Sequence, residues 1–231
     1  MLSKNEAEQA IYYKVLRFLE QHRGEYYPYE YQGILNYSIH PNLRTITKTD
    51  VIREIYDKLG LIPDDFNIYL AFMELIEKNF GVDGKNICEV GGGVFPMLAE
   101  RIHLQQKTGS ITVFDPRLSP SVQGNDRFIL KKESFCSDTP VDGIDLMIGL
   151  MPCKGADPLI ESALKNQIDF MLWLCEGGPH GDYFDFYESD DEWLSSIICH
   201  ARYGVRSANM GQLQKVFLPD FSEYPIIYNQ R

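Results

Sequence analysis

The chain of 231 residues is 44% hydrophobic, 13% aromatic and 24% charged, a composition typical of globular proteins that excludes disordered, collagen-like and coiled-coil chains. Lys and Arg number 22 and Asp and Glu number 33, so the net charge is −11, which opposes general binding to nucleic-acid phosphates and leaves only a local basic patch as a way to bind RNA or DNA. No stretch approaches the roughly 18 apolar residues of a membrane span, and residues 1–6 lack the apolar core of a signal peptide. We therefore expect a cytoplasmic protein with no membrane-bound part.

The five cysteines form no Cys-x-x-Cys pair, and Cys88, Cys175 and Cys199 lie within apolar runs. This pattern favours small buried thiols over disulfides or a zinc cluster. We accordingly expect no metal site.

The first helical pattern covers residues 6–21, where apolar side chains recur at near-helical spacing between charged ones, and it predicts an amphipathic helix. The next stretch, residues 24–33, holds four tyrosines and Pro28 between two flanking glycines, which predicts a short loop rather than a long helix. These tyrosines could pack across a ligand, bind an acceptor, or simply fasten the helical segment to the rest of the chain. They are Tyr26, Tyr27, Tyr29 and Tyr31.

Helical patterns resume at residues 51–56, where Thr49 and Asp50 precede the helix as capping residues, and again at residues 64–80. The segment 1–82 is therefore predicted to be all helical. We interpret it as a helical N-terminal cap on the domain that follows.

From Lys85 onward, short apolar runs alternate with turns and helical segments, which is typical of βαβ units and a parallel sheet. The predicted strands span residues 86–90, 110–114, 127–131, 146–150 and 170–174, with two more at residues 205–210 and 224–228. The predicted helices span residues 97–106, 158–165 and 191–203. Residues 83–231 should therefore form an α/β domain, a Rossmann-like seven-stranded and mostly parallel sheet with helices on both faces.

The most informative motif follows the first predicted strand and reads Ile87-Cys-Glu-Val-Gly-Gly-Gly-Val-Phe-Pro-Met-Leu-Ala-Glu-Arg. A buried strand leads into Gly91, Gly92 and Gly93 and then into a helix. Glycine lacks a Cβ atom, so the backbone can turn tightly and a ligand can lie against it, while the start of the helix offers unpaired N–H groups. The alternative is a tight turn that binds nothing.

An acidic residue at the end of the second predicted strand supports ligand binding at this corner. Asp115 follows Gly93 by about 22 residues, at the point where the acid of a doubly wound sheet hydrogen-bonds the ribose hydroxyls of a bound nucleoside. A carboxylate there also repels a 2′-phosphate. The alternative is a turn residue ahead of Pro116.

The spacing of the glycines separates two classes of cofactor. The dinucleotide motif G-x-G-x-x-G requires a third glycine at position 96, where this chain has Pro96, so NAD is the weaker hypothesis. Together with Glu89, which precedes the first glycine by two residues, Gly91 and Gly93 resemble the first motif of the class I S-adenosylmethionine-dependent methyltransferases. The Gly-Gly-Gly-x-x-Pro form is also similar to the loop of nicotianamine-synthase-like relatives, which use the same cofactor.

The resemblance extends to the fourth and fifth predicted strands. Residues 145–153 and 157–175 are similar to the segment of methyltransferases that carries a Gly-Leu-His-x-Cys-Gly motif, but Met151 and Lys154 replace its His and its second Gly. Phe95 also stands where the family has its third glycine. The resemblance covers the chain from the first predicted strand to the end, and it implies a Rossmann-like fold with S-adenosylmethionine as cofactor.

The resemblance implies roles for individual residues as well. Glu89 would orient the methionine end of the cofactor, the backbone of Gly91, Gly92 and Gly93 would contact it, and Asp115 would bind the ribose hydroxyls. The residues implied around the adenine are Pro116, Arg117, Ser134 and Phe135, and those beneath the transferred group are Leu150, Met151 and Pro152.

No catalytic set stands out, which agrees with methyl transfer, because the sulfonium methyl is already activated and the protein mainly aligns the acceptor. The candidates for a catalytic base are Tyr29 and His180. His180 should emerge near the carboxyl end of the fifth strand. Cys153 is expected to be an unreactive thiol. Residues 176–192 carry seven acids and no Lys or Arg and could meet a cationic acceptor.

We predict a methyltransferase that acts on a small-molecule acceptor, a choice that the acidic composition favours. One alternative is transfer of the aminocarboxypropyl arm of the same cofactor, as in nicotianamine-synthase-like enzymes. Another is a non-catalytic binding or assembly module that keeps the fold, and a cavity filled by Phe95 or by the tyrosine loop would favour it. The sequence does not indicate the oligomeric state.

Overall fold

The computed structural model describes residues 4–39, 50–64, 67–105, 108–174, 192, 213–216, 218 and 226–229. Its helices are α1 (Lys4–Gln21), α2 (Pro28–Ile39), α3 (Asp50–Lys58), α4 (Ile68–Phe80), α5 (Met97–Gln105) and α6 (Ala156–Asn166), with the short 3-10 helix η3 (Cys153–Gly155) before α6. Its strands are β1 (Asn86–Val90), β2 (Ser110–Phe114), β3 (Phe128–Lys131), β4 (Leu146–Leu150), β5 (Asp169–Trp173), β6 (Leu213–Val216) and β7 (Ile226–Asn229). The described helices include no candidate membrane span.

The seven strands form one sheet in the order β3-β2-β1-β4-β5-β7-β6. Neighbouring strands from β3 to β5 pair in parallel, whereas β7 runs antiparallel to both β5 and β6. The first five strands therefore have the order of a doubly wound nucleotide-binding sheet, in which the chain direction across the sheet reverses between β1 and β4. The predicted α/β class and the mostly parallel seven-stranded sheet are confirmed.

The first five predicted strands agree with the structure to within one residue at either end. The last predicted strand, residues 224–228, overlaps β7 at residues 226–229, and β6 at residues 213–216 was not predicted. The strand predicted at residues 205–210 lies outside the described residues. The helix predicted at residues 191–203 does too, apart from Glu192.

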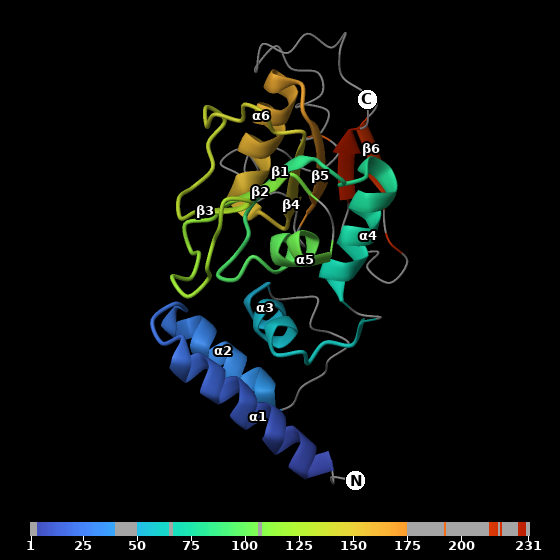
Figure 1. Cartoon of the computed structure of the whole chain (residues 1–231). Coiled ribbons are helices and arrows are strands. Elements are labelled where there is room, and N and C mark those ends of the chain that lie inside the picture. Colours follow the sequence, from blue (N-terminus) through green and yellow to red (C-terminus); the bar gives the residue numbers. More distant parts are fainter. Residues whose placement is uncertain are drawn as a thin grey trace.

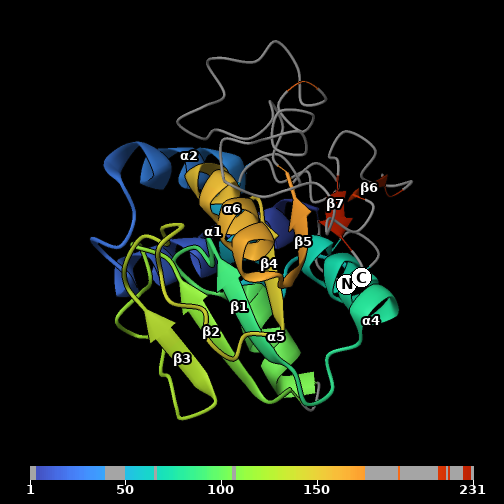
Figure 2. The same cartoon turned by 90° about the horizontal axis from the view of Figure 1, so that it is seen from above.

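Helices cover both faces of the sheet (Figures 1 and 2). Strand side chains alternate between the faces, so Ile87 of β1 belongs to the core beneath α4 and α5, whereas its neighbour Cys88 belongs to the core beneath α6. The α1 and α2 helices lie side by side, and α3 lies between this pair and α5 (Figure 1).

Contrary to the prediction of a short loop at residues 24–33, α2 begins at Pro28 and runs through Gly33. Proline is favoured in the first turn of a helix, because its fixed φ suits the helix and no partner is needed there for the missing N–H. Glu30 then accepts the N–H of Tyr27 at 2.8 Å, which is half of a capping box. An exposed glycine inside the helix costs only about 1 kcal/mol, too little to end it.

The N-terminal helices and the sheet share a hydrophobic core. Leu19 of α1, Ile55 of α3 and Phe72 of α4 are fully buried in the same cluster as Trp173 of β5, and the rings of Phe72 and Trp173 meet edge to face with centroids 5.5 Å apart. The change of sequence pattern near residue 82 therefore marks a change of secondary structure, and the hydrophobic core continues across it.

Ion pairs fix α3 to α5. Arg101 donates hydrogen bonds from its Nη2 and Nε atoms to the buried carboxylate of Asp57, and the shortest of these are 2.7 Å. Lys58 pairs with Glu100 at 2.8 Å. Because α5 follows the glycine loop directly, these pairs position α3 against that loop.

Candidate active site

A cavity of about 430 Å³ opens at the carboxyl ends of β1, β2 and β4, where the strand order reverses and doubly wound sheets bind their ligands. Its volume is within the range of small-molecule sites. The α/β part contributes the lining residues Glu89, Val90, Gly91, Gly92, Gly93, Phe114, Asp115, Pro116, Arg117, Ser134, Phe135, Leu150, Met151, Pro152, Cys153, Lys154 and Gly155. The helical segment contributes Val51, Arg53, Glu54 and Tyr69.

The cavity brings together every residue that the resemblance implied for cofactor binding, from four separate strand ends: Glu89, Gly91, Gly92, Gly93, Asp115, Pro116, Ser134, Phe135 and Leu150. Of the two candidate bases, Tyr29 lies outside the cavity. Tyr29 is 72% exposed, stacks on Tyr27 and is absent from the cavity lining. His180 and the acidic stretch 176–192, Glu192 excepted, lie outside the described residues.

The glycines are required by backbone conformation and by space. Gly91 and Gly93 have φ of 81° and 77°, a left-handed conformation that strains residues with a Cβ atom. A Cβ on Gly91 would lie 2.6 Å from Cα of Pro152, and one on Gly93 would lie 2.5 Å from Oε2 of Glu54. The loop therefore packs against the end of β4 on one side and against α3 on the other.

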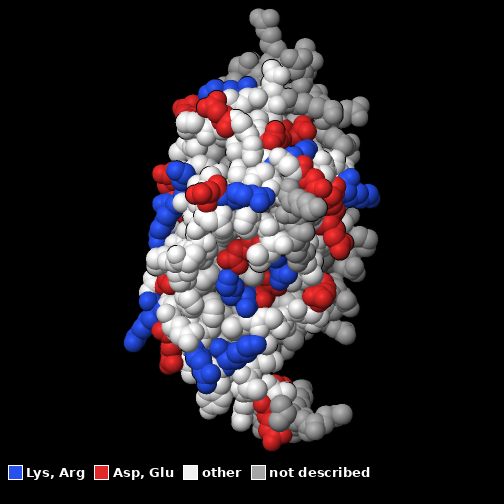
Figure 3. All heavy atoms as spheres, in the orientation of Figure 1, with Lys and Arg blue, Asp and Glu red and all other residues white. Residues whose placement is uncertain are grey.

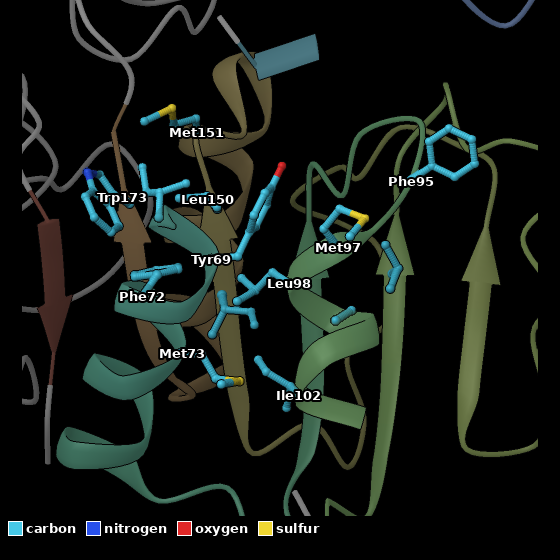
Figure 4. Close-up of a cluster of buried hydrophobic side chains, with 14 of the residues drawn as sticks. Tyr69, Phe72, Met73, Phe95, Met97, Leu98, Ile102, Leu150, Met151 and Trp173 are labelled. Atoms are coloured by element: carbon cyan, nitrogen blue, oxygen red, sulfur yellow. The ribbon is translucent and has the colours of Figure 1, made fainter. Parts of the chain in front are cut away.

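Phe95 does not fill the cavity. Its ring is buried against Phe18 of α1 and His22, which follows α1, with ring centroids 5.5 Å and 5.0 Å away. The ring points away from Met151 and Leu150 (Figure 4). A side chain can therefore stand at the position of the family's third glycine without closing the site.

The tyrosine-rich segment does not fill the cavity either. None of Tyr26, Tyr27, Tyr29 and Tyr31 lines it. The segment contacts the cavity wall through Arg117, which donates to Glu30 at 2.9 Å and lies over the ring of Tyr27, 5.1 Å from its centroid. This arrangement favours the interpretation that the segment fastens α2 to the sheet.

Asp115 is held in a fixed orientation at the end of β2. Its Oδ2 accepts the N–H of Gly93 at 2.9 Å, and its Oδ1 accepts the N–H of Arg117 at 2.7 Å. Burial raises the pKa of this carboxyl, while the two N–H groups oppose the rise. Each oxygen keeps a lone pair for a further donor from the cavity.

Glu89 is a buried acid at the end of β1. Burial raises the pKa of its carboxyl to about 8, and a backbone N–H bond from Ala99 opposes this rise. Its Oε2 has no hydrogen-bond partner within the described part of the chain. An orphaned carboxylate oxygen costs free energy unless a donor reaches it, so this wall of the cavity is suited to a ligand that carries a hydrogen-bond donor.

Glu54 is a second buried acid in the cavity and comes from α3. Its Oε1 accepts the N–H of Phe95 at 2.7 Å, and its Oε2 accepts the N–H of Val94 at 3.1 Å. Burial raises the pKa of its carboxyl to about 8, against the effect of these two N–H bonds.

The turn after β4 has a strained backbone. Met151 and Cys153 adopt φ of 53° and 49°, and non-glycine residues in this region persist only where the surrounding structure holds them. Arg53, which is 3% exposed, donates to Sδ of Met151 at 3.3 Å. The helical segment therefore supports the floor of the cavity as well as the glycine loop.

The sequence did not indicate Arg53, Glu54 or Tyr69 as site residues. Every residue of α3 from Ile52 to Asp57 is buried, charged residues included, whereas charges between apolar residues ordinarily mark the solvated face of a helix. Only the tertiary contacts of α3 place its charges in the site.

No protein-family model and no curated protein matches the chain. Among solved structures, it is similar to MtNAS in complex with MTA and tNA, with 12% identity over 98% of this chain and 97% of that chain and a TM-score of 0.49. It is also similar to Thermoplasma acidophilum 1320, with 14% identity over 77% and 95% of the two chains and a TM-score of 0.45. Human N-acetylserotonin methyltransferase in complex with SAM gives 16% identity over 95% and 67% and a TM-score of 0.43.

The ligands named in these structures belong to those proteins. The fold of this chain is defined by its own strand order and strand directions. The chain has a Rossmann-like fold with a seven-stranded, mostly parallel sheet, as predicted.

Proposed function

We propose that this protein is an S-adenosylmethionine-dependent methyltransferase that acts on a small-molecule acceptor. The observation that carries the proposal is the cavity at the reversal of strand order, which gathers the implied binding residues from four strand ends around a space of about 430 Å³. A tight turn without a ligand would require none of this convergence.

The donors and acceptors on the cavity wall fit this cofactor. The orphaned Oε2 of Glu89 suits the ammonium of the methionine moiety, because a bound cation favours ionisation of this buried carboxyl and would then satisfy it with a charge-assisted hydrogen bond. The carboxylate of Asp115, oriented by two N–H groups, suits the ribose hydroxyls. Phe135, which is buried against Phe114, offers an apolar wall for the adenine.

When bound, S-adenosylmethionine would supply an activated methyl group. The residues of this chain would then bind and orient: Asp115 fixes the sugar, and Glu89 fixes the amino-acid end. Leu150 and Met151 form the floor at the end of β4. Alignment of the acceptor above this floor is the main catalytic contribution expected of the protein.

Ligand-dependent thermal unfolding tests the proposal against NAD binding. A ligand at a hundred times its Kd stabilises a protein by about 2.7 kcal/mol, which in a chain of this size raises Tm by roughly 5–10 °C. We expect this rise with adenosylhomocysteine and no rise with NAD. Protection by NAD and not by adenosylhomocysteine would contradict the proposal.

Identification of the nucleoside product tests the type of transfer. Methyl transfer releases adenosylhomocysteine, whereas transfer of the aminocarboxypropyl arm releases methylthioadenosine. Incubation with S-adenosylmethionine and candidate amine, thiol and hydroxyl acceptors, followed by mass spectrometry, should show adenosylhomocysteine. Accumulation of methylthioadenosine in an acceptor-dependent manner would support the alternative reaction instead.

A further inference from the structure

Three successive N–H groups in the loop that enters α5 are bonded to carboxylates of the chain itself. Gly93 donates to Asp115 at 2.9 Å, and Val94 and Phe95 donate to the two oxygens of Glu54 at 3.1 Å and 2.7 Å. The loop leads directly into the nine-residue helix α5, whose N-terminus carries a partial positive charge.

In nucleotide-binding sheets of this topology, this position belongs to the ligand's phosphates. The N–H groups after the glycine turn and the positive end of the helix together bind the phosphate or pyrophosphate. In this chain, Glu54 takes that position from the opposite side. It is 5% exposed, and its Oε2 lies so close to the loop that a Cβ on Gly93 would come within 2.5 Å of it.

We propose that Glu54 is a specificity-determining residue that closes the phosphate position of the cavity, so that the site accepts nucleosides without a phosphate group and rejects nucleotides. The proposal rests on the proposed function only in taking a nucleoside as the ligand. It goes beyond it in assigning the exclusion of nucleotides to a residue of the helical segment.

Glu54 cannot easily move aside for a phosphate. Two ion pairs just after Glu54 fix α3 to α5. Asp57 pairs with Arg101, and Lys58 pairs with Glu100. A phosphate would have to break the two N–H bonds of Glu54 and leave the displaced carboxyl buried without these partners, which costs free energy.

The test measures binding of adenosylhomocysteine, ADP and inorganic pyrophosphate to the wild type, Glu54→Gln and Glu54→Ala by calorimetry. Glu54→Gln keeps the shape but replaces one of the two acceptor oxygens by an amide nitrogen that cannot accept an N–H, and Glu54→Ala frees both N–H groups. The wild type should bind ADP at least about tenfold more weakly than adenosylhomocysteine. Both variants should gain at least about tenfold in affinity for ADP, with the larger gain in Glu54→Ala.

Asp138→Asn is the matched control, because it removes an exposed carboxylate that pairs with Lys165 away from the cavity, and its affinity for ADP should equal that of the wild type. Wild-type binding of ADP as tight as that of adenosylhomocysteine, or no gain in folded Glu54→Gln, would overturn the proposal. If the wild type binds no adenosylhomocysteine while the Glu54 variants gain pyrophosphate binding, the proposed function fails and the role of Glu54 stands.

Discussion

Three carboxylates give the site its chemical character at the scale of single residues. Asp115 is oriented by two N–H groups, Glu54 is bonded to two others, and Glu89 keeps a buried oxygen without a partner among the described residues. Their positions suit different tasks. Asp115 and Glu89, at the ends of β2 and β1, can receive donors from a ligand, whereas Glu54, on α3, accepts the two N–H groups that precede α5.

Replacement of Asp115 should weaken nucleoside binding. Asp115→Ala removes charge-assisted hydrogen bonds to the ribose, each worth roughly 1.5–3 kcal/mol, so the Kd for adenosylhomocysteine should rise by about tenfold or more. Calorimetric titration measures the change. Asp138→Ala, an exposed acid that pairs with Lys165 away from the cavity, is the matched control. Unchanged affinity in a folded Asp115 variant would contradict the ribose assignment.

The buried acids should make stability depend on pH. Burial raises the pKa of Glu54 and of Glu89 to about 8, well above the usual value near 4.3 of an unfolded chain. Between pH 5 and about 8 the folded chain keeps protons that the unfolded chain has lost, so the free energy of unfolding should fall as pH rises and level off above pH 8.

Glu89→Gln tests this dependence. The variant lacks one of the two groups with a raised pKa. Between pH 5 and 8 its free energy of unfolding should therefore fall less than that of the wild type, by a difference of at least about 1 kcal/mol. Urea unfolding across this range measures both, with Asp138→Asn, which removes an exposed acid away from the cavity, as a control that should behave as the wild type does. Parallel curves for Glu89→Gln and the wild type would show that Glu89 ionises normally.

At the scale of elements, α3 connects the helical segment to the ligand loop. Its consecutive residues Arg53 and Glu54 reach the end of β4 and the glycine loop, and Asp57 reaches α5. Because each charge is buried and has a defined partner, this nine-residue helix acts as a positioning element for the cavity.

Loss of the Asp57 carboxylate should destabilise the fold. Asp57 is 2% exposed in its pair with Arg101, which is 24% exposed, so Asp57→Ala leaves a partly buried guanidinium without its partner and should lower the free energy of unfolding by about 2–4 kcal/mol. The exposed pair of Lys165 and Asp138 provides the comparison. Lys165→Ala should change stability by less than about 1 kcal/mol. Equal effects of the two substitutions in urea unfolding would contradict the role assigned to α3.

The sequence was informative where function and local structure coincide. The place of Asp115 in the cavity could be predicted because it follows a buried strand, and strand ends meet at one edge of a parallel sheet, whereas that of Glu89 was implied by the resemblance of its motif. Glu54 could not, because its role depends on the docking of α3 against a loop distant in sequence. The start of α2 was mispredicted for a local reason, since Pro28 limits a helix interior but favours a first turn.

At the scale of the whole molecule, the helical segment and the sheet depend on each other. Residues of α1, α3 and α4 complete the core beneath one face of the sheet. On the surface shown in Figure 3, acidic and basic side chains are interspersed, so the net charge of −11 is not gathered there into a patch of one sign. Shared packing, together with ion pairs such as those of Asp57 with Arg101 and Glu30 with Arg117, holds the two segments together.

Removal of the helical segment should prevent stable folding. A fragment of residues 83–231 would expose the sheet face that holds Trp173 and Ile148, both fully buried in the whole chain, together with the glycine loop beneath α3. We expect this fragment to lack a cooperative thermal transition by circular dichroism and to bind no adenosylhomocysteine. A cooperative transition like that of the whole chain would show that residues 1–82 form a detachable cap.

The most direct test of the central claim is a calorimetric titration of the wild-type protein with adenosylhomocysteine at neutral pH. A cavity with a fixed ribose acid, an orphaned buried carboxylate and a closed phosphate position predicts saturable binding of one nucleoside per chain, with ADP at least about tenfold weaker under the same conditions. Absence of binding at millimolar adenosylhomocysteine would contradict the claim that this fold keeps a working cofactor site.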